Sequence, residues 1–169
     1  MPDVYGQFLR WTLAESAAST LTEGNAIQTG AQSRLSGGGF LALEIHQILG
    51  LVNIPNDAPT ANTVEQVNGA ISTRSGLSTM PTLADEHCVY KTSLKRRAGI
   101  AVYLPETLIA QDMPSLSVFN PPLLLSHKAL YPYVLGTDDG STSAFYGYIF
   151  YNYVDIEGAL AVEALESFR

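Results

Sequence analysis

The chain has only one cysteine, Cys88, and three histidines among its 169 residues. A single cysteine cannot form an intrachain disulfide, which excludes the disulfide-stabilised folds. The histidines, His46, His87 and His127, lie in three separate segments, and no pair has the spacing of a helical zinc site. Because apolar residues follow Cys88, we interpret it as a small buried hydrophobe rather than a nucleophile.

Charge is also scarce. Charged residues make up 15% of the chain, and 9 basic against 16 acidic residues give a net charge of −7. Hydrophobic residues reach 46%, which argues against disorder and suits a surface that neighbouring subunits partly cover. An acidic chain is poorly suited to wrapping nucleic acid. The best basic cluster, Lys95, Arg96 and Arg97, is a weak candidate for phosphate contact, because so short a run is most often a solvated turn or the end of a strand.

No long hydrophobic run is present. The most apolar stretch, residues 41–49, contains Glu44, His46 and Gln47, so it is too polar to span a membrane. Residues 1–5 lack the basic region and apolar core of a signal peptide, and the chain has no Asn-x-Ser/Thr sequon. We therefore expect a soluble protein made in the cytoplasm.

Catalytic and cofactor motifs are missing as well. The three glycines at 37–39 are not followed by Lys-Ser/Thr, and no Gly-x-Ser-x-Gly elbow occurs. Residues 85–88, Asp-Glu-His-Cys, are consecutive and cannot all point at one metal ion from a strand. Asp138 and Asp139 precede Gly140, which is an ordinary turn sequence as well as a possible calcium ligand pair. We predict no enzyme, no metal site and no cofactor.

The last third of the chain predicts two strands and a helix. Two apolar runs, residues 123–135 and 144–154, flank the Asp-Asp-Gly turn, a strong signal for a β-hairpin. After residue 154 the apolar spacing becomes helical, with Asp155 as the N-cap of a short helix that ends near residue 168.

Earlier segments predict further strands, and the whole chain, residues 1–169, reads as one domain. We expect strands over residues 6–14, 40–52 and 64–73, with an extended arm between the first two, so that residues 1–39 hold a strand and the arm. In the first strand, Phe8, Arg10 and Thr12 alternate with Leu9 and Trp11. The expected fold is all-β: a single jelly-roll β-sandwich of about eight strands with one short C-terminal helix.

One strand, residues 40–52, carries large apolar residues on two faces. Strict alternation places Leu41, Leu43, Ile45 and Leu49 on one face and Ile48 on the other.

The final strand also carries large side chains on both faces. Alternation directs Phe145, Ile149, Tyr151 and Tyr153 one way, and Tyr146, Tyr148, Phe150 and Val154 the other. A sheet with one solvated face lacks this pattern, so a second layer or subunit is expected there. The candidate subunit-interface residues are Tyr146, Tyr148, Tyr151 and Tyr153. The tyrosines could instead form a sugar-stacking platform, as in a carbohydrate-binding module, or simply fill the core.

Four segments carry a family resemblance, namely residues 12–23, 41–48, 71–85 and 123–168. Their order and spacing resemble those of the small single jelly-roll capsid proteins of tailless icosahedral viruses. The resemblance covers most of the chain and rests on no single diagnostic motif.

This resemblance implies a structural coat protein of the virion, made in the host cytoplasm, that assembles into pentamers and hexamer-like capsomers. Residues 1–33 contain only one basic residue, Arg10, whereas many small coat proteins carry a basic arm that neutralises the genome. The resemblance therefore favours the coats of membrane-containing double-stranded DNA viruses of archaea and thermophilic bacteria. It implies as partners a second major capsid protein, penton or membrane-associated virion proteins, and no direct contact with nucleic acid. The alternative is a ligand-binding β-sandwich such as a carbohydrate-binding module.

Overall fold

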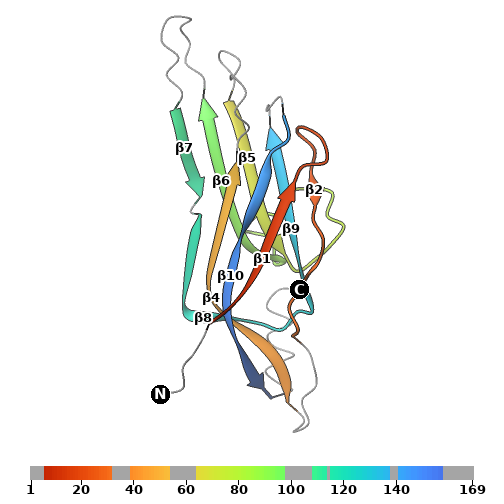
Figure 1. The fold of residues 1–169 in the computed structure, drawn as a ribbon, viewed down its shortest axis with the longest axis vertical. Coiled ribbons are helices and arrows are strands. Elements are labelled where there is room, and N and C mark those ends of the chain that lie inside the picture. Colours follow the sequence, from red (N-terminus) through yellow and green to blue (C-terminus); the bar gives the residue numbers. More distant parts are fainter. Residues whose placement is uncertain are drawn as a thin grey trace, which may run out of the picture.

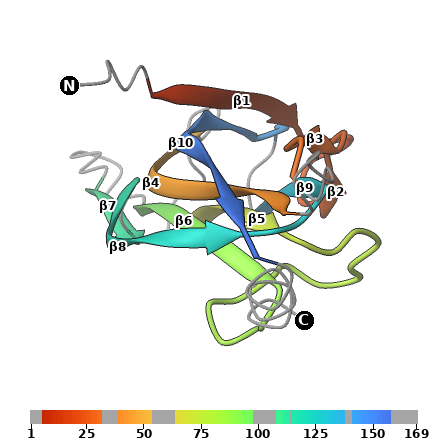
Figure 2. The same ribbon diagram turned by 90° about the horizontal axis from the view of Figure 1, so that it is seen from below.

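The fold was analysed in a computed structural model, which describes residues 6–31, 39–53, 64–97, 108–113, 115–137 and 141–157. Every regular element in these ranges is a β-strand, and all strand pairs are antiparallel. The strands form two sheets that face each other across a core, so the expected all-β sandwich is confirmed (Figures 1 and 2). No helix long and apolar enough to cross a membrane occurs among these residues.

The first sheet has four strands in the order β1-β10-β4-β8: β1 (Gln7–Ala14), β10 (Ala144–Ile156), β4 (Phe40–Asn53) and β8 (Leu116–Leu125). The second has the order β2-β9-β5-β6-β7, with β3 also paired to β9: β2 (Thr22–Glu23), β3 (Ile27–Gln28), β9 (Ala129–Thr137), β5 (Val64–Ser72), β6 (Cys88–Arg97) and β7 (Leu108–Met113). In Figure 1 the long strands run roughly along the long axis of the molecule.

The expected C-terminal hairpin is wrong. β9 pairs with β5 in one sheet, whereas β10 pairs with β1 and β4 in the other. The run 123–135 is also not one strand, because residues 123–125 end β8 and β9 begins at Ala129. A turn sequence indicates where a chain can reverse, but it does not decide which strands pair. Here β9 pairs with β2, β3 and β5, and β10 pairs with β1 and β4. The expected helix start at Asp155 is wrong too, because β10 continues to Ile156; residues 158–169 lie outside the described residues.

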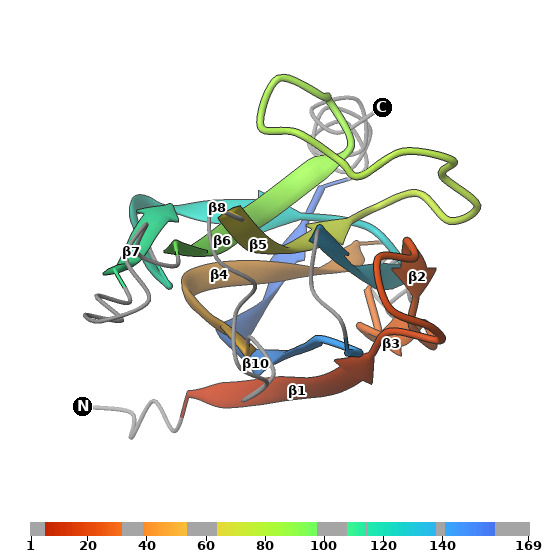
Figure 3. The same cartoon turned by 90° about the horizontal axis from the view of Figure 1, so that it is seen from above.

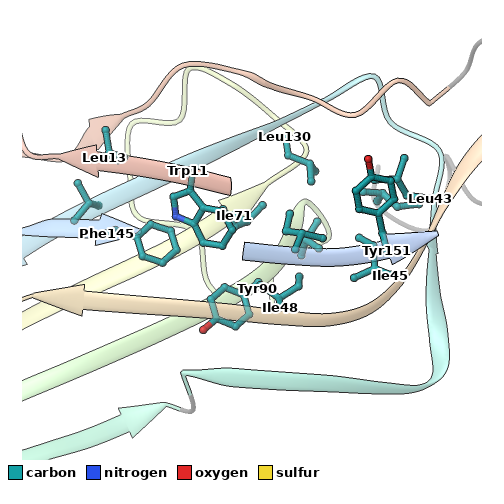
Figure 4. Close-up of a cluster of buried hydrophobic side chains, with 14 of the residues drawn as sticks. Trp11, Leu13, Leu43, Ile45, Ile48, Ile71, Tyr90, Leu130, Phe145 and Tyr151 are labelled. Carbon is teal, nitrogen blue, oxygen red and sulfur yellow. The ribbon is translucent and has the colours of Figure 1, made fainter. Parts of the chain in front are cut away.

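Buried aromatic rings fill the space between the sheets (Figure 4). The rings of Trp11 on β1 and Phe145 on β10 lie 5.1 Å apart, centroid to centroid, in a tilted arrangement. Phe145 packs against β5 of the opposite sheet at Gly69, where an added Cβ would lie 2.4 Å from the ring. The two sheets therefore approach closely at a point where only glycine leaves room for the ring.

A β-bulge in β4 reverses the expected orientation of one half of that strand. Phe150 pairs with Gln47 and Tyr151 with Ile45, so His46 is an extra residue without a cross-strand partner on β10. Such an extra residue shifts the alternation by one position. Ile45 and Ile48 are both fully buried as a result, and Leu49, which alternation had placed on the same face as Ile45, lies on the opposite face.

Tyr90 links the two sheets through its side chain. It belongs to β6, yet its hydroxyl lies 2.7 Å from the carbonyl oxygen of Ser115 and 3.2 Å from that of Gly50, and it accepts a hydrogen bond from the Gly50 amide. Burial raises the pKa of Tyr90 to about 12, and burial likewise raises the pKa of the Cys88 thiol to about 11. Both groups are thus held in their neutral forms.

These two shifts predict a stability that is lost in alkali. A group whose pKa is higher in the folded state stabilises the fold fully below its unfolded pKa, and this contribution is lost as the pH rises through the folded pKa. The free energy of unfolding should be level to about pH 9 and fall by about 2 kcal/mol or more between pH 10 and 12. Urea titrations at a series of pH values measure this. A free energy that stays level to pH 12 would contradict the burial of these groups.

Candidate functional site

The outward side of the four-stranded sheet carries a continuous apolar surface, which we call the outer face. Strand register brings its members together: Phe8 lies opposite Phe150, and Tyr148 lies between Arg10 on β1 and Leu49 on β4. Leu49 in turn lies opposite Leu116 on β8. The apolar residues of the outer face are Phe8, Leu49, Leu51, Leu116, Val118, Tyr146, Tyr148 and Phe150.

These side chains are unusually exposed for their size. Phe8 is 59% exposed, Val118 69% and Tyr148 40%. Tyr148 packs edge-on against Phe8 with ring centroids 6.0 Å apart, and it lies 6.3 Å from Phe150 in a tilted arrangement. The exposed rings therefore form one cluster across β1 and β10. Contiguous apolar patches of this kind on soluble proteins mark surfaces that bind another molecule.

Two charged side chains lie on the outward side of this sheet among the described residues, Glu44 and Arg10. Glu44 lies opposite Asn152, with one carboxylate oxygen 3.5 Å from the His46 ring, at one end of the apolar cluster. Arg10 lies within the cluster, opposite Tyr148, and forms no ion pair with any described residue. Together with Thr12, Tyr146 and Tyr148 it surrounds a hollow of about 320 Å³. Trp11 and Gly147 line the same hollow, and both are inward-facing residues of the paired strands β1 and β10. This volume equals that of about ten water molecules. An acidic or polar group attached to an apolar body matches the chemistry of the hollow.

The four tyrosines predicted at a subunit interface do not all share this face. Tyr146 and Tyr148 point outward, as alternation predicts. Tyr151 does not belong to an exposed interface, because it is only 4% exposed and packs in the core, where burial raises its pKa. Tyr153 is 36% exposed, but its hydroxyl donates a 2.7 Å hydrogen bond to the carbonyl oxygen of Thr29. Of the four tyrosines, Tyr146 and Tyr148 therefore remain the candidate interface residues.

The basic cluster at the end of β6 does not form a phosphate site around Arg96. That side chain is buried, and its Nε donates a 2.6 Å hydrogen bond to Oε2 of Glu65 on β5, which its Nη2 also contacts. The neighbouring strand thus neutralises its charge. Lys95 is half-buried on the same strand, and the Arg97 side chain lies outside the described structure.

The contacts of residues 85–88 are those of a folded turn and not of a metal site. The carboxylate of Asp85 accepts hydrogen bonds from the amide and hydroxyl of Thr82, which lower the pKa of Asp85. Cys88 is buried, with its thiol near the carbonyl oxygen of Tyr90. Within the described ranges, no three His, Cys, Asp or Glu side chains gather as metal ligands would.

In comparisons with known proteins, no family model matches the chain and no curated protein matches it. Its site must be interpreted from its own residues. Sequence reasoning missed Arg10, Leu116 and Val118 as members of the outer face. The alternation of Phe8, Arg10 and Thr12 predicts that these residues share one face of β1. Which residues of other strands lie beside them depends on the pairing register across the sheet.

Proposed function

We propose that the protein is a structural subunit of an icosahedral viral shell and that its sandwich is a single jelly roll. The outer face carries this proposal. It exposes aromatic and aliphatic side chains over all four strands of a sheet, with Arg10 placed among them. A shell subunit buries such surfaces against its neighbours, each contact being modest enough for reversible assembly.

The pairing of the strands supports the jelly-roll part of the proposal. A jelly roll is a long antiparallel strip of strand pairs that is rolled around a core, and it is common in viral capsid and lectin domains. Here the pairs are nested along the chain: β1 with β10, β2 and β3 with β9, β4 with β8, and β5 with β6. The outermost pair joins the first described strand to the last one, as rolling up such a strip requires.

The experiment is to measure the mass and shape of the purified protein over a range of concentration and salt, by light scattering and negative-stain electron microscopy. The 18.2 kDa chain should form rings, capsomers or closed shells. Adding salt should leave assembly intact or promote it, because an apolar contact with few charges is screened little. A monomer at every concentration and salt condition would overturn the proposal.

A sugar-binding surface is the second candidate, because the outer face also presents ring faces beside a polar hollow. Carbohydrate-binding modules stack sugars on exposed aromatic side chains. A glycan screen of the natural protein and of a Tyr146→Ala, Tyr148→Ala double variant separates the two functions. Sugar binding that the double variant loses, in a protein that stays monomeric, would favour this second function.

A further inference from the structure

The positive charge of Arg10 restricts what can cover the outer face. In a symmetric contact of two identical outer faces, every apolar residue could meet an apolar residue. Arg10, however, lies among apolar side chains, and the one described carboxylate on the outward side, Glu44, lies at the other end of the cluster opposite Asn152, 3.5 Å from the His46 ring of its own chain. Burying an arginine without an acidic partner is costly. The matching surface should therefore be a different one, with an apolar group and a carboxylate side by side.

This chain carries such a surface on the turn between β5 and β6. Leu83 is 59% exposed at its tip, and the Glu86 side chain is 72% exposed, with one carboxylate oxygen 3.8 Å from the His87 ring. The turn is also well ordered by its own hydrogen bonds, since the Asp85 amide donates to the carbonyl oxygen of Thr82 and the Cys88 amide donates to that of Asp85, each at 2.9 Å. Little conformational freedom would be lost when it binds.

The turn lies away from the β1 edge of the outer face, where the hollow is. In Figures 2 and 3, the loop between β5 and β6 projects on the side of the molecule opposite β1. One copy can therefore offer its turn to the outer face of a second copy while its own outer face stays available to a third. Head-to-tail contacts of this type close into rings when the rotation between copies allows it.

We infer that the turn at residues 82–86 of one copy docks on the outer face of the next, with Leu83 in the hollow and Glu86 paired with Arg10. The inference rests on the proposed shell function and specifies the contact through which copies of the chain assemble. Chemical complementarity carries it: the hollow combines Arg10 with the rings of Tyr146 and Tyr148, and the turn combines a carboxylate with an aliphatic side chain.

Charge reversal tests the pairing. Arg10→Glu and Glu86→Arg should each raise the concentration needed for assembly by about 10-fold or more, because each places like charges together in a contact. The double variant Arg10→Glu, Glu86→Arg restores an opposite pair and should assemble nearly as the natural chain does. Both positions are exposed, so circular dichroism should show that all three variants fold. Double-variant assembly no better than that of the single variants would overturn the pairing.

Crosslinking tests the contact independently of charge. Thr12→Cys and Leu83→Cys chains, mixed after separate purification and oxidised mildly, should give a disulfide-linked dimer containing one chain of each type. Cys88 should not interfere because it is buried. A Thr20→Cys chain mixed with Leu83→Cys is the control and should not crosslink. Particles that form without the specific crosslink would overturn this inference but leave the shell function standing, whereas a natural chain that never assembles would overturn both.

Discussion

The Tyr148→Asp chain should remain monomeric at concentrations where the natural chain assembles. Tyr148 lies at the centre of the outer face, between Phe8 and Phe150 and beside the hollow. An aspartate there would have to lose its hydration when the face is covered, and this costs several kcal/mol. The concentration needed for assembly should therefore rise about 100-fold or more. Light scattering of both chains over the same concentration range measures the change.

Two controls separate assembly from folding in this experiment. Tyr148 is 40% exposed and forms no hydrogen bond with its side chain among the residues that the structure describes, so Tyr148→Asp should lower the free energy of unfolding by only about 1 kcal/mol. Tyr148→Phe retains the ring and should assemble like the natural chain. Normal assembly of a folded Tyr148→Asp chain would show that the outer face is not the contact surface.

Arg96→Met should be the most destabilising change considered for the folded domain. It leaves the Glu65 carboxylate, which is 4% exposed, without the guanidinium that it contacts. Removing one partner of a buried ion pair costs about 3–5 kcal/mol. Since domains of this size are stable by only about 5–15 kcal/mol, the variant should unfold at much lower urea concentration. Urea denaturation followed by circular dichroism measures the loss.

The double variant Glu65→Leu, Arg96→Met is the matched control for this prediction. Replacing both members of a buried pair with apolar side chains of similar size is often neutral or stabilising, because neither charge then has to be dehydrated. The double variant should therefore be much closer to the natural chain than Arg96→Met is. If Arg96→Met alone costs less than about 1 kcal/mol, the pair is not buried as described.

The sequence predicted the strands well where local pattern decides the outcome. Residues 6–14 and 64–73 were expected as strands and correspond to β1 and β5. On β1, Trp11 is buried while Phe8 points outward, as alternation indicated. In such stretches the period of two in the apolar residues is sufficient, because both strand and orientation follow from it.

The sequence did not predict which strands pair when they lie far apart along the chain. The Asp-Asp-Gly sequence at 138–140 lies outside the described residues, and the strands on either side of it, β9 and β10, pair with strands far away in the chain rather than with each other. The bulge at His46 was equally unpredictable, because no residue type indicates it, and it places Leu49 on the outer face, opposite to the face that carries Ile45. The outer face consists of side chains from four strands that the pairing register brings together. The sequence of one strand predicts only that strand's contribution.

In assembled particles, the outer face should be covered by a neighbouring subunit. Hydroxyl-radical footprinting, read by mass spectrometry on assembled particles and on dissociated chains, measures this at individual side chains. We expect Phe8, Tyr148 and Phe150 to be labelled in dissociated chains and strongly protected in particles, while Tyr90, buried in the fold, is labelled weakly in both. Equal labelling of the three outer-face rings in both states would contradict the account.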